Sequence, residues 1–268
     1  MKRFITPICV VLLTLSLITG CGGQQPQKQQ PAGPSQQQQA VEFKDGIYTA
    51  EEADYDDHGW KAVATVAVKD GKIERAFYDE VNKDNQIKSL DQDYAANMKK
   101  QTKETPLDAV TKLSASLIDK QDPEKVDTVT SATATSDKFK TLAGRALEGS
   151  PGEKGAGGLY DGLYKAEAKD FDEHGYKAYA TVIVKDGKIA NAYYDELNKD
   201  TGTYKSHDED YQKNMKAQAG VSDNEAYTKL IDSLIAKQDA SKTDAVTGAT
   251  STTDNFKELM GKALSYAK

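Results

Sequence analysis

The chain has 268 residues, of which 38% are hydrophobic and 29% charged. This length is enough for one large domain or two small ones. Its 35 Lys and Arg against 42 Asp and Glu give a net charge of −7, so no sequence-wide attraction to nucleic acid is expected and a DNA- or RNA-binding role is disfavoured. Both cysteines, Cys9 and Cys21, lie near the N-terminus, which excludes a disulfide framework or a cysteine-based zinc or iron–sulfur site in the rest of the chain.

Residues 1–20 have the composition of a secretory signal peptide. Lys2 and Arg3 form a basic start, and the apolar run 8–18 is too short to span a bilayer, which needs about 20 apolar residues. Residues 17–21, Leu-Ile-Thr-Gly-Cys, resemble the processing box of bacterial lipoproteins, in which cleavage before the cysteine accompanies attachment of a diacylglyceryl group to its thiol. That resemblance implies a membrane lipid anchor at Cys21. An ordinary signal peptide with an incidental cysteine is the alternative.

A tether is predicted after the anchor. Residues 21–41 are rich in Gln, Pro and Gly, and 22–40 hold no apolar side chain large enough to build a core, so this segment is expected to be disordered. A flexible coil of this length spans about 20–25 Å, which would hold folded domains just off the membrane.

The remainder of the chain contains one pattern twice. The segment HGWKAVATVAVKDGKI from His58 recurs as HGYKAYATVIVKDGKI from His174, and the later thirds of the two copies match as well. A repeat this long indicates tandem domains, because solenoid units run about 20–50 residues. We therefore expect a first domain over 42–148, a Gly-rich linker over 149–158 that acts as a hinge, and a second domain over 159–268.

Each copy is predicted to begin with strands. Alternating apolar residues over 176–185 have the period of a strand, and the pair Asp186-Gly187 is a strong hairpin signal before a return strand over 189–194. The first copy repeats this pattern around its own Asp-Gly pair. The polar segments that follow, YDEVNKD from Tyr78 and YDELNKD from Tyr194, are predicted to be loops.

Two helical stretches follow in each copy. In the second copy Tyr227, Leu230 and Leu234 share one apolar face, which Ile231 and Ile235 broaden. The last helix is expected to bury five residues: Phe256, Leu259, Met260, Ala263 and Leu264. The predicted fold class is therefore α+β, with two homologous small domains, each a twisted antiparallel sheet covered by helices.

The strongest signal for chemistry stands just before the last helix of each copy. It reads DAVTGAT from Asp244 to Thr250 and DTVTSAT from Asp127 to Thr133. Small and hydroxyl residues before a helix leave backbone N–H groups exposed at the positive end of its dipole, an arrangement that binds phosphate. The same residues are preferred at any helix start, so a purely structural cap is the alternative.

The motif resembles the flavinylation motif of the FMN-binding domain family, Asp-x-x-(Ser/Thr)-Gly-Ala-(Ser/Thr). In that family a flavin transferase takes FMN from FAD and esterifies its phosphate to the last threonine hydroxyl. The resemblance covers the motif and the layout of each copy, and it implies covalent FMN on Thr133 and Thr250, up to two per chain. The loop residues that it implies are Asp127, Thr130, Ser131 and Ala132 in the first copy and Asp244, Thr247, Gly248 and Ala249 in the second.

The first copy departs from the family pattern at Ser131, where the family has glycine. If that position requires a positive φ, serine would strain the backbone by about 1 kcal/mol or more. Flavinylation of Thr133 would then be less favoured than that of Thr250.

Polar and aromatic residues that recur in both copies are further candidates for contacts with the isoalloxazine ring. They are His58, Trp60, Tyr78, Asp79, Glu80, Asn82 and Met98 in the first copy and His174, Tyr176, Tyr194, Asp195, Glu196, Asn198 and Met215 in the second. The aromatic residue after each His-Gly pair would stack on the ring or begin a core-facing strand. The Tyr-Asp-Glu segment would frame the polar edge of the ring or form a solvated loop held by Asx turns.

Neither a metal site nor a catalytic residue is assigned. The segment 54–59 begins like a calcium-binding EF-hand loop, but Thr65 stands where the loop requires a bidentate Glu, and the second copy has Thr181 there. The three histidines lack ligand partners at metal spacing.

Two such domains on a lipoprotein resemble the PplA-type flavoproteins of Gram-positive extracellular electron transfer. The resemblance implies an electron carrier rather than a substrate-specific oxidoreductase, lipid-anchored at the extracytoplasmic face of the cell membrane. It would take electrons from a quinol or NADH dehydrogenase system and pass them to ferric iron or free flavins outside the cell. The alternative is a non-redox surface binding lipoprotein, and leader residues 13–20 resemble a secreted peptide pheromone of related lipoproteins.

Overall fold

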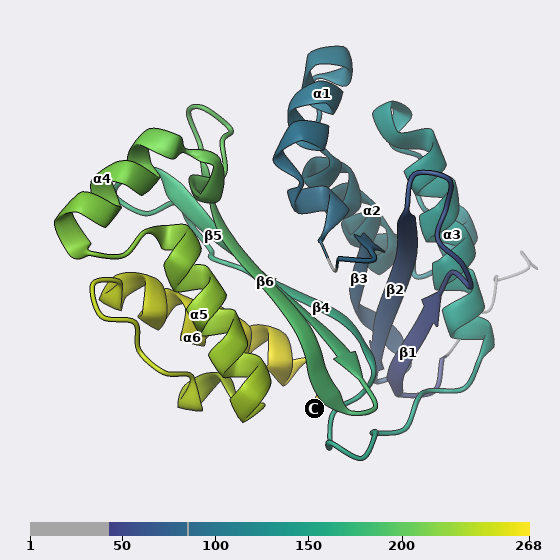
Figure 1. The fold of residues 1–268 in the computed structure, drawn as a ribbon. Coiled ribbons are helices and arrows are strands. Elements are labelled where there is room, and N and C mark those ends of the chain that lie inside the picture. Colours follow the sequence, from purple (N-terminus) through teal and green to yellow (C-terminus); the bar gives the residue numbers. More distant parts are fainter. Residues whose placement is uncertain (1–42, 85) are drawn as a thin grey trace, which may run out of the picture. The chain divides into compact units, whose positions relative to one another are not determined.

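The computed structural model describes residues 43–84 and 86–268, which belong to one compact unit, Ala40–Lys268. The predicted signal peptide, Cys21 and the tether lie outside the described residues. The described chain contains the same succession of elements twice, three strands followed by three α-helices (Figure 1).

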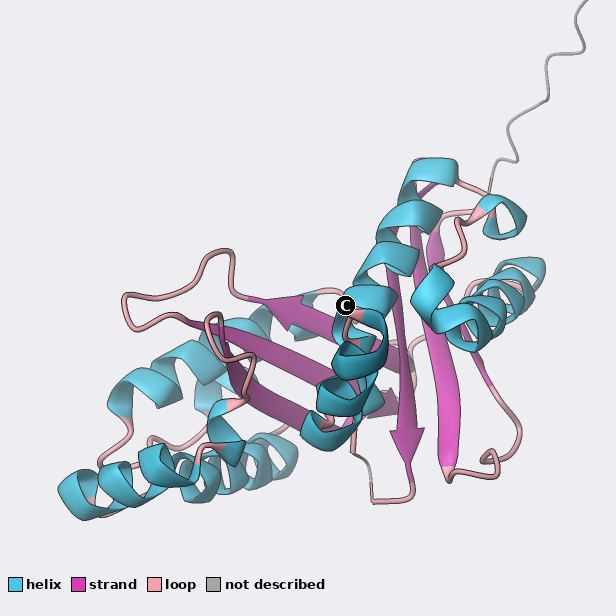
Figure 2. Ribbon diagram, turned by 90° about the horizontal axis from the view of Figure 1, so that it is seen from above, coloured by secondary structure: helices cyan, strands magenta, loops and turns pink. Residues whose placement is uncertain are grey.

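The first repeat contains β1 (Gly46–Glu51), β2 (Trp60–Lys69), β3 (Lys72–Asn82), α1 (Gln92–Thr102), α2 (Pro106–Lys120) and α3 (Thr133–Glu148). The second contains β4 (Gly162–Glu167), β5 (Tyr176–Lys185), β6 (Lys188–Asn198), α4 (Glu209–Ala219), α5 (Asp223–Lys237) and α6 (Thr250–Ser265). Each set of strands forms one antiparallel sheet in chain order (Figure 2). The predicted α+β class with two tandem homologous domains is confirmed.

Local sequence accounts for the hairpins and for the starts of the helices. In both hairpins the Asp-Gly pair has positive φ at both positions, 52° and 72° at Asp70 and Gly71, which is the type I′ geometry that matches the twist of the strands. Helices α2 and α5 begin with capping boxes, in which Thr105 pairs with Asp108 and Ser222 pairs with Glu225, so the first N–H groups of both helices are partly satisfied.

The polar segment after each hairpin is strand, and the prediction of a loop there is wrong. Strand β3 continues through Tyr78, Asp79 and Glu80, and the two acidic residues are only 1% and 3% exposed. Strand β6 continues in the same way through its Tyr-Asp-Glu segment. Polar composition misled the prediction because these carboxylates are satisfied by buried partners of the protein rather than by water.

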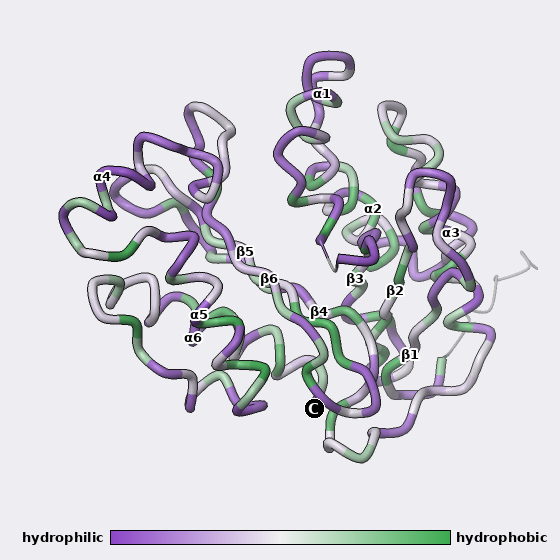
Figure 3. Tube along the Cα trace, in the orientation of Figure 1, coloured by the Kyte–Doolittle hydropathy of each residue, from purple (hydrophilic) through white to green (hydrophobic). Residues whose placement is uncertain are grey.

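Helices α2 and α3 pack on the first sheet and α5 and α6 on the second, whereas α1 and α4 mainly contact the neighbouring helix and 3-10 turn. The predicted apolar face of α6 is buried, as are Tyr227, Leu230 and Leu234 of α5, while Ile231 and Ile235 are partly buried against the same core. Along the chain trace, α1 and α4 are mostly hydrophilic, whereas α5, α6 and the strands carry hydrophobic stretches (Figure 3). No helix in the described part of the chain is long and apolar enough to cross a membrane.

The face of each sheet that its own helices leave free carries contacts between the repeats. The Leu163 N–H donates to Thr65 Oγ1 at 2.9 Å, and Phe77 stacks on Tyr266 with ring centroids 5.5 Å apart. Leu163 is fully buried in the apolar cluster of the first repeat, although it belongs to the second. These contacts explain why strands of both repeats carry apolar residues on both faces.

The linker contacts both repeats. The Gly152 N–H donates to the Ile47 carbonyl at 2.7 Å, and the Gly157 N–H donates to the Asp186 carbonyl at 3.3 Å. A side chain at Gly155 would place its Cβ 2.2 Å from the Gly187 nitrogen, so glycine is required for this close approach. The segment predicted to be a hinge is therefore held by hydrogen bonds at both ends.

We expect Leu163→Ala to destabilise the folded chain by about 3 kcal/mol, because it removes a fully buried side chain at the contact between the repeats. Urea denaturation measures the loss. Ile118→Ala on α2, where the side chain is 37% exposed, is the matched control and should cost less than about 1 kcal/mol. Equal, small effects of both variants would contradict the contact.

Candidate functional site

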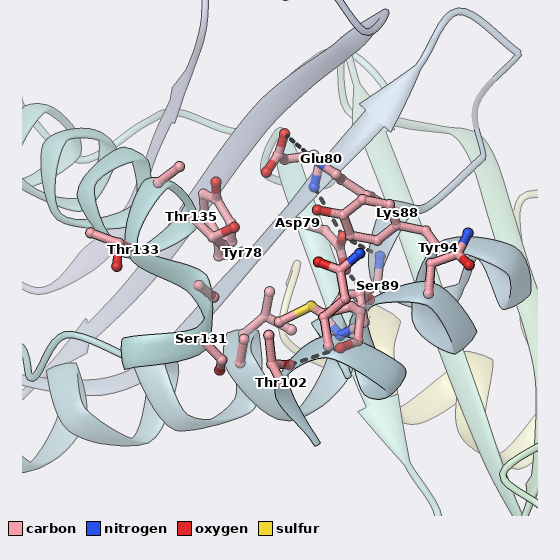
Figure 4. Close-up of a pocket in the computed structure, with 18 residues that line it drawn as sticks. Tyr78, Asp79, Glu80, Lys88, Ser89, Tyr94, Thr102, Ser131, Thr133 and Thr135 are labelled. Carbon is pink, nitrogen blue, oxygen red and sulfur yellow. Dashed lines mark hydrogen bonds and ion pairs between the residues drawn. The ribbon is translucent and has the colours of Figure 1, made fainter. Parts of the chain in front are cut away.

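A cavity of about 300 Å³ lies beside the start of α3 in the first repeat (Figure 4). Its walls come from the end of β3, the short 3-10 turn Lys88–Leu90, α1, and the first turns of α2 and α3. The predicted site residues that line it are Tyr78, Asp79, Glu80, Met98, Ser131, Ala132 and Thr133. Figure 4 shows Ser131 and Thr133 on one side of this cavity and Lys88, Ser89 and Tyr94 on the other.

Other predicted residues of the first repeat do not belong to the lining of this cavity. His58 is exposed, and its backbone N–H donates to Asp56 in a surface turn. Trp60 begins strand β2, and the Lys88 ammonium lies 5.7 Å from the centre of its ring. Asp127 and Thr130 are exposed on the approach to α3.

The turn before the last helix differs between the repeats. In both, a carbonyl accepts from the N–H three residues on: Val129 from Ala132 at 2.8 Å, and Val246 from Ala249 at 3.0 Å. Gly248 has a φ of +85°, whereas Ser131 lies in a 3-10 turn without positive φ. These signs correspond to a type II and a type I turn, which differ by a flip of the central peptide. The strain considered for serine therefore does not arise.

Contacts around the two turn residues explain the difference. A Cβ at Gly248 would lie 2.3 Å from the Ala219 carbonyl oxygen, so only glycine fits in the second repeat. In the first repeat the Ser131 hydroxyl donates to Glu104 at 2.6 Å, which holds the turn by a side-chain contact.

Two buried carboxylates form the inner wall of the cavity. Asp79 accepts from the Ser89 hydroxyl at 2.5 Å and from the ammonium of Lys165, a residue of β4 in the second repeat, at 2.6 Å. Glu80 accepts from Lys88 at 3.0 Å and from Lys138 of α3 at 3.2 Å. An unpaired buried charge is costly, and these lysines give both carboxylates oppositely charged partners inside the fold.

The Tyr78 hydroxyl in the same wall is buried without a hydrogen-bond partner. Its ring packs edge-on against Phe139 at 5.4 Å, and burial raises the pKa of the phenol well above its usual range. A buried hydroxyl without a partner costs free energy, so Tyr78 offers a hydrogen bond to a bound group.

The second repeat places the corresponding residues in a similar arrangement. Asp195 accepts from the Glu196 N–H at 2.7 Å and from the Ser206 hydroxyl, and burial raises the pKa of its carboxyl. Glu196 accepts from the Lys205 ammonium and from the Tyr194 hydroxyl, the latter at 2.9 Å. His174 is exposed, as His58 is.

Lys205 also contacts two aromatic rings of the second repeat. Its ammonium lies 4.4 Å from the ring centre of Tyr176 and 4.9 Å from that of Tyr211, within cation–π range. Lys205 and its counterpart Lys88 are not among the predicted site residues, although a Lys-Ser pair recurs at the same place in both copies.

Asp223, which is also not among the predicted site residues, lies in the first turn of α5, where the first repeat has Pro106. It is 1% exposed; its Oδ1 accepts from the Thr252 hydroxyl at 3.3 Å, and its Oδ2 has no partner. Burial raises its pKa to about 6, although Lys205 opposes the shift. An acidic residue after a serine cap is typical of any helix start, so the sequence held no signal for it.

In comparisons with known proteins, both repeats match the same domain family. Residues 58–148 and 174–265 each match the model of the FMN-binding domain. A 15 kDa lipoprotein of Treponema pallidum is 38% identical over 104 residues, which is 39% of this chain and 72% of that protein.

Two solved structures are also similar. A crystal structure from Clostridium perfringens is 41% identical, covers 41% of this chain and 88% of its own, and has a TM-score of 0.39. A solution structure from Clostridium thermocellum is 28% identical, covers 40% and 91%, and has a TM-score of 0.29.

The burial of Asp223 predicts how the stability of the fold depends on pH. Its folded-state pKa of about 6 lies above its ordinary value of 3.8, so the cost of ionising it in the fold appears as pH rises through this window. Asp223→Asn removes that cost. We expect the stability of the variant, measured against the unmodified chain as its free energy of unfolding, to be about 2 kcal/mol higher at pH 7.5 than at pH 4.

Urea titrations at the two pH values measure this difference. Asp232→Asn, at an exposed position of the same helix, is the control and should show no comparable change between them. An Asp223→Asn effect that is equal at both pH values would contradict the buried ionisation.

Proposed function

Because the chain belongs to the FMN-binding domain family, with one copy of the domain in each repeat, we propose that it is an electron-carrying lipoprotein with FMN esterified to Thr133 and Thr250. The attachment bond, the number of flavins and the electron transfer are parts of this proposal.

The position of the Thr133 hydroxyl carries the proposal. Thr133 is the first residue of α3, is exposed, and lines the cavity. A phosphate joined there would lie at the positive end of the helix dipole, beside N–H groups that have no partner within the helix. Thr250 is likewise the exposed first residue of α6, so a flavin transferase would have access to both hydroxyls.

The cavity of the first repeat fits a flavin in chemistry. Met98 and Val110 supply apolar surface for a flat ring, while the buried Tyr78 hydroxyl and the Lys88 ammonium supply hydrogen-bond donors. FMN would contribute reversible acceptance of electrons. The protein residues would exclude water from the ring, fix its orientation and set the charge around it.

An ester bond suits a protein that is exposed to the cell exterior, since a dissociable cofactor would be lost by dilution there. The Treponema pallidum relative is named a lipoprotein, which supports lipid attachment of this chain at Cys21 and a place at the extracytoplasmic face of the membrane. Two acyl chains give stable anchoring where one gives only marginal binding. In this proposal a quinol or NADH dehydrogenase system donates electrons, and ferric iron or free flavins accept them.

Thr133→Ala and Thr250→Ala test the attachment sites. In chain produced together with its flavin transferase, each variant should lose one covalently bound FMN and the double variant should lose both, because the attachment oxygen is removed. Intact mass under denaturing conditions counts the groups. Thr135→Ala and Ser251→Ala remove neighbouring hydroxyls of the same helix turns and should leave both flavins in place.

Two outcomes would overturn this proposal. A double variant that still carries covalent FMN would place the ester elsewhere. An unmodified chain that stays colourless and flavin-free beside the transferase would favour a non-redox surface binding lipoprotein instead.

Cys21→Ala tests the anchor. The variant lacks the thiol that would carry the diacylglyceryl group, so we expect the chain to move from the membrane fraction to the soluble fraction of the producing cells. Cys9→Ala, within the predicted signal peptide, is the matched control and should leave the mature chain in the membrane fraction. Equal membrane retention of both variants would contradict lipidation at Cys21.

A further inference from the structure

We propose that the two flavin sites are electrostatically unequal and that the site of the first repeat is the stronger electron acceptor, so that electrons pass from the flavin on Thr250 to the flavin on Thr133. This inference rests on the proposed function. It adds a direction of electron flow between the two domains, which their shared fold does not suggest.

In the first site, both buried carboxylates are matched by ammonium groups. Asp79 pairs with Lys165 at 2.6 Å, and Glu80 pairs with Lys88 and Lys138 at 3.0 and 3.2 Å. Lys138 also contacts the partly exposed carboxylates of Asp56 and Glu52, at 3.0 and 3.7 Å, where water screens the charges.

Two of these three lysines are absent from the second site. In the duplicated motif, the position of Lys138 is occupied by Asn255. Lys165 lies at the position that Thr49 holds in the first repeat, so the pairing across the repeats runs in one direction only. The carboxylate of Asp195 instead accepts hydrogen bonds from the Tyr193 hydroxyl, at 3.2 Å, and from Ser206.

The second site also holds one more carboxyl. Asp223 replaces Pro106 of the first site and is buried with one oxygen unpaired. Lys205 is the ammonium group paired with Glu196 there, and it also faces Asp223. In the second site Lys205 thus faces two buried carboxyls, Glu196 and Asp223, and Asp195 has hydrogen bonds only from hydroxyl and N–H groups. In the first site the two buried carboxylates contact three ammonium groups, of which Lys138 also contacts Asp56 and Glu52.

This difference acts on the reduced flavin. At neutral pH the fully reduced isoalloxazine is an anion, which nearby ammonium groups stabilise and uncompensated carboxylates destabilise. If FMN is bound at both threonines, the transfer would carry two electrons and one proton from the site of Thr250 to the site of Thr133, so that the one flavin would be oxidised as the other is reduced. The membrane donor of the proposed function supplies the electrons to the Thr250 flavin.

Single-flavin forms of the full chain separate the two sites. Thr250→Ala should retain only the first flavin and Thr133→Ala only the second, and spectroelectrochemical titration at pH 7.5 gives the midpoint potential of each. We expect the first flavin to have the higher potential, by an amount that corresponds to at least roughly tenfold preference for the electrons at equilibrium. Equal potentials, or a higher potential for the second flavin, would overturn the inference.

Charge variants test the cause. In the Thr250→Ala form, Lys138→Asn introduces the residue of the second repeat and should lower the potential, as should Lys165→Met. Lys140→Asn makes the same charge change on α3, where the ammonium contacts Thr128 instead, and should leave the potential nearly unchanged. Equal shifts for Lys138→Asn and Lys140→Asn would mean that net charge, not these contacts, sets the potential, and would contradict the inference.

Removal of a carboxyl from the second site is the reciprocal test. In the Thr133→Ala form, Asp223→Asn should raise the potential, while Asp232→Asn on the exposed part of α5 should not. Failure of this inference is distinct from failure of the proposed function: single variants without flavin would contradict both, whereas flavin-bearing variants of equal potential would contradict the inference alone.

Discussion

The structure depends on the pairing of buried carboxylates at the ends of β3 and β6. Asp79 and Glu80 are almost fully buried, and an ionised group without partners would cost several kcal/mol there. Their partners come from a 3-10 turn, from α3 and from the second repeat, through Lys88, Lys138 and Lys165. The same contacts therefore hold the sheet, the last helix and the neighbouring repeat around one cavity.

Duplication preserved this arrangement and changed a few positions within it. The hydroxyl at the start of the last helix is kept in both repeats, whereas the turn before it contains Ser131 in one and Gly248 in the other. The first residue of the preceding helix is Pro106 in one and Asp223 in the other. One fold thus presents two threonines in different electrostatic surroundings, on which the proposed difference between the two flavin sites depends.

The sequence predicted the parts of this fold that follow from local pattern. Strand alternation, the Asp-Gly hairpins and the apolar face of α6 were all visible, because each repeats with the period of its element. The ends of β3 and β6 were not, since a run such as Tyr-Asp-Glu has the composition of a loop until its buried partners are known. Lys165 was equally invisible, because its partner Asp79 is distant in sequence and lies in the other repeat. The motif threonines came from a family resemblance, and the structure adds the cavity beside Thr133.

Peptide mapping of the native chain tests the central claim most directly. After proteolysis of chain made beside its flavin transferase, tandem mass spectrometry should find FMN phosphate on the fragment that contains Thr250 and on the fragment that contains Thr133. Unmodified fragments at both positions, or a flavin attached to any other residue, would contradict the account.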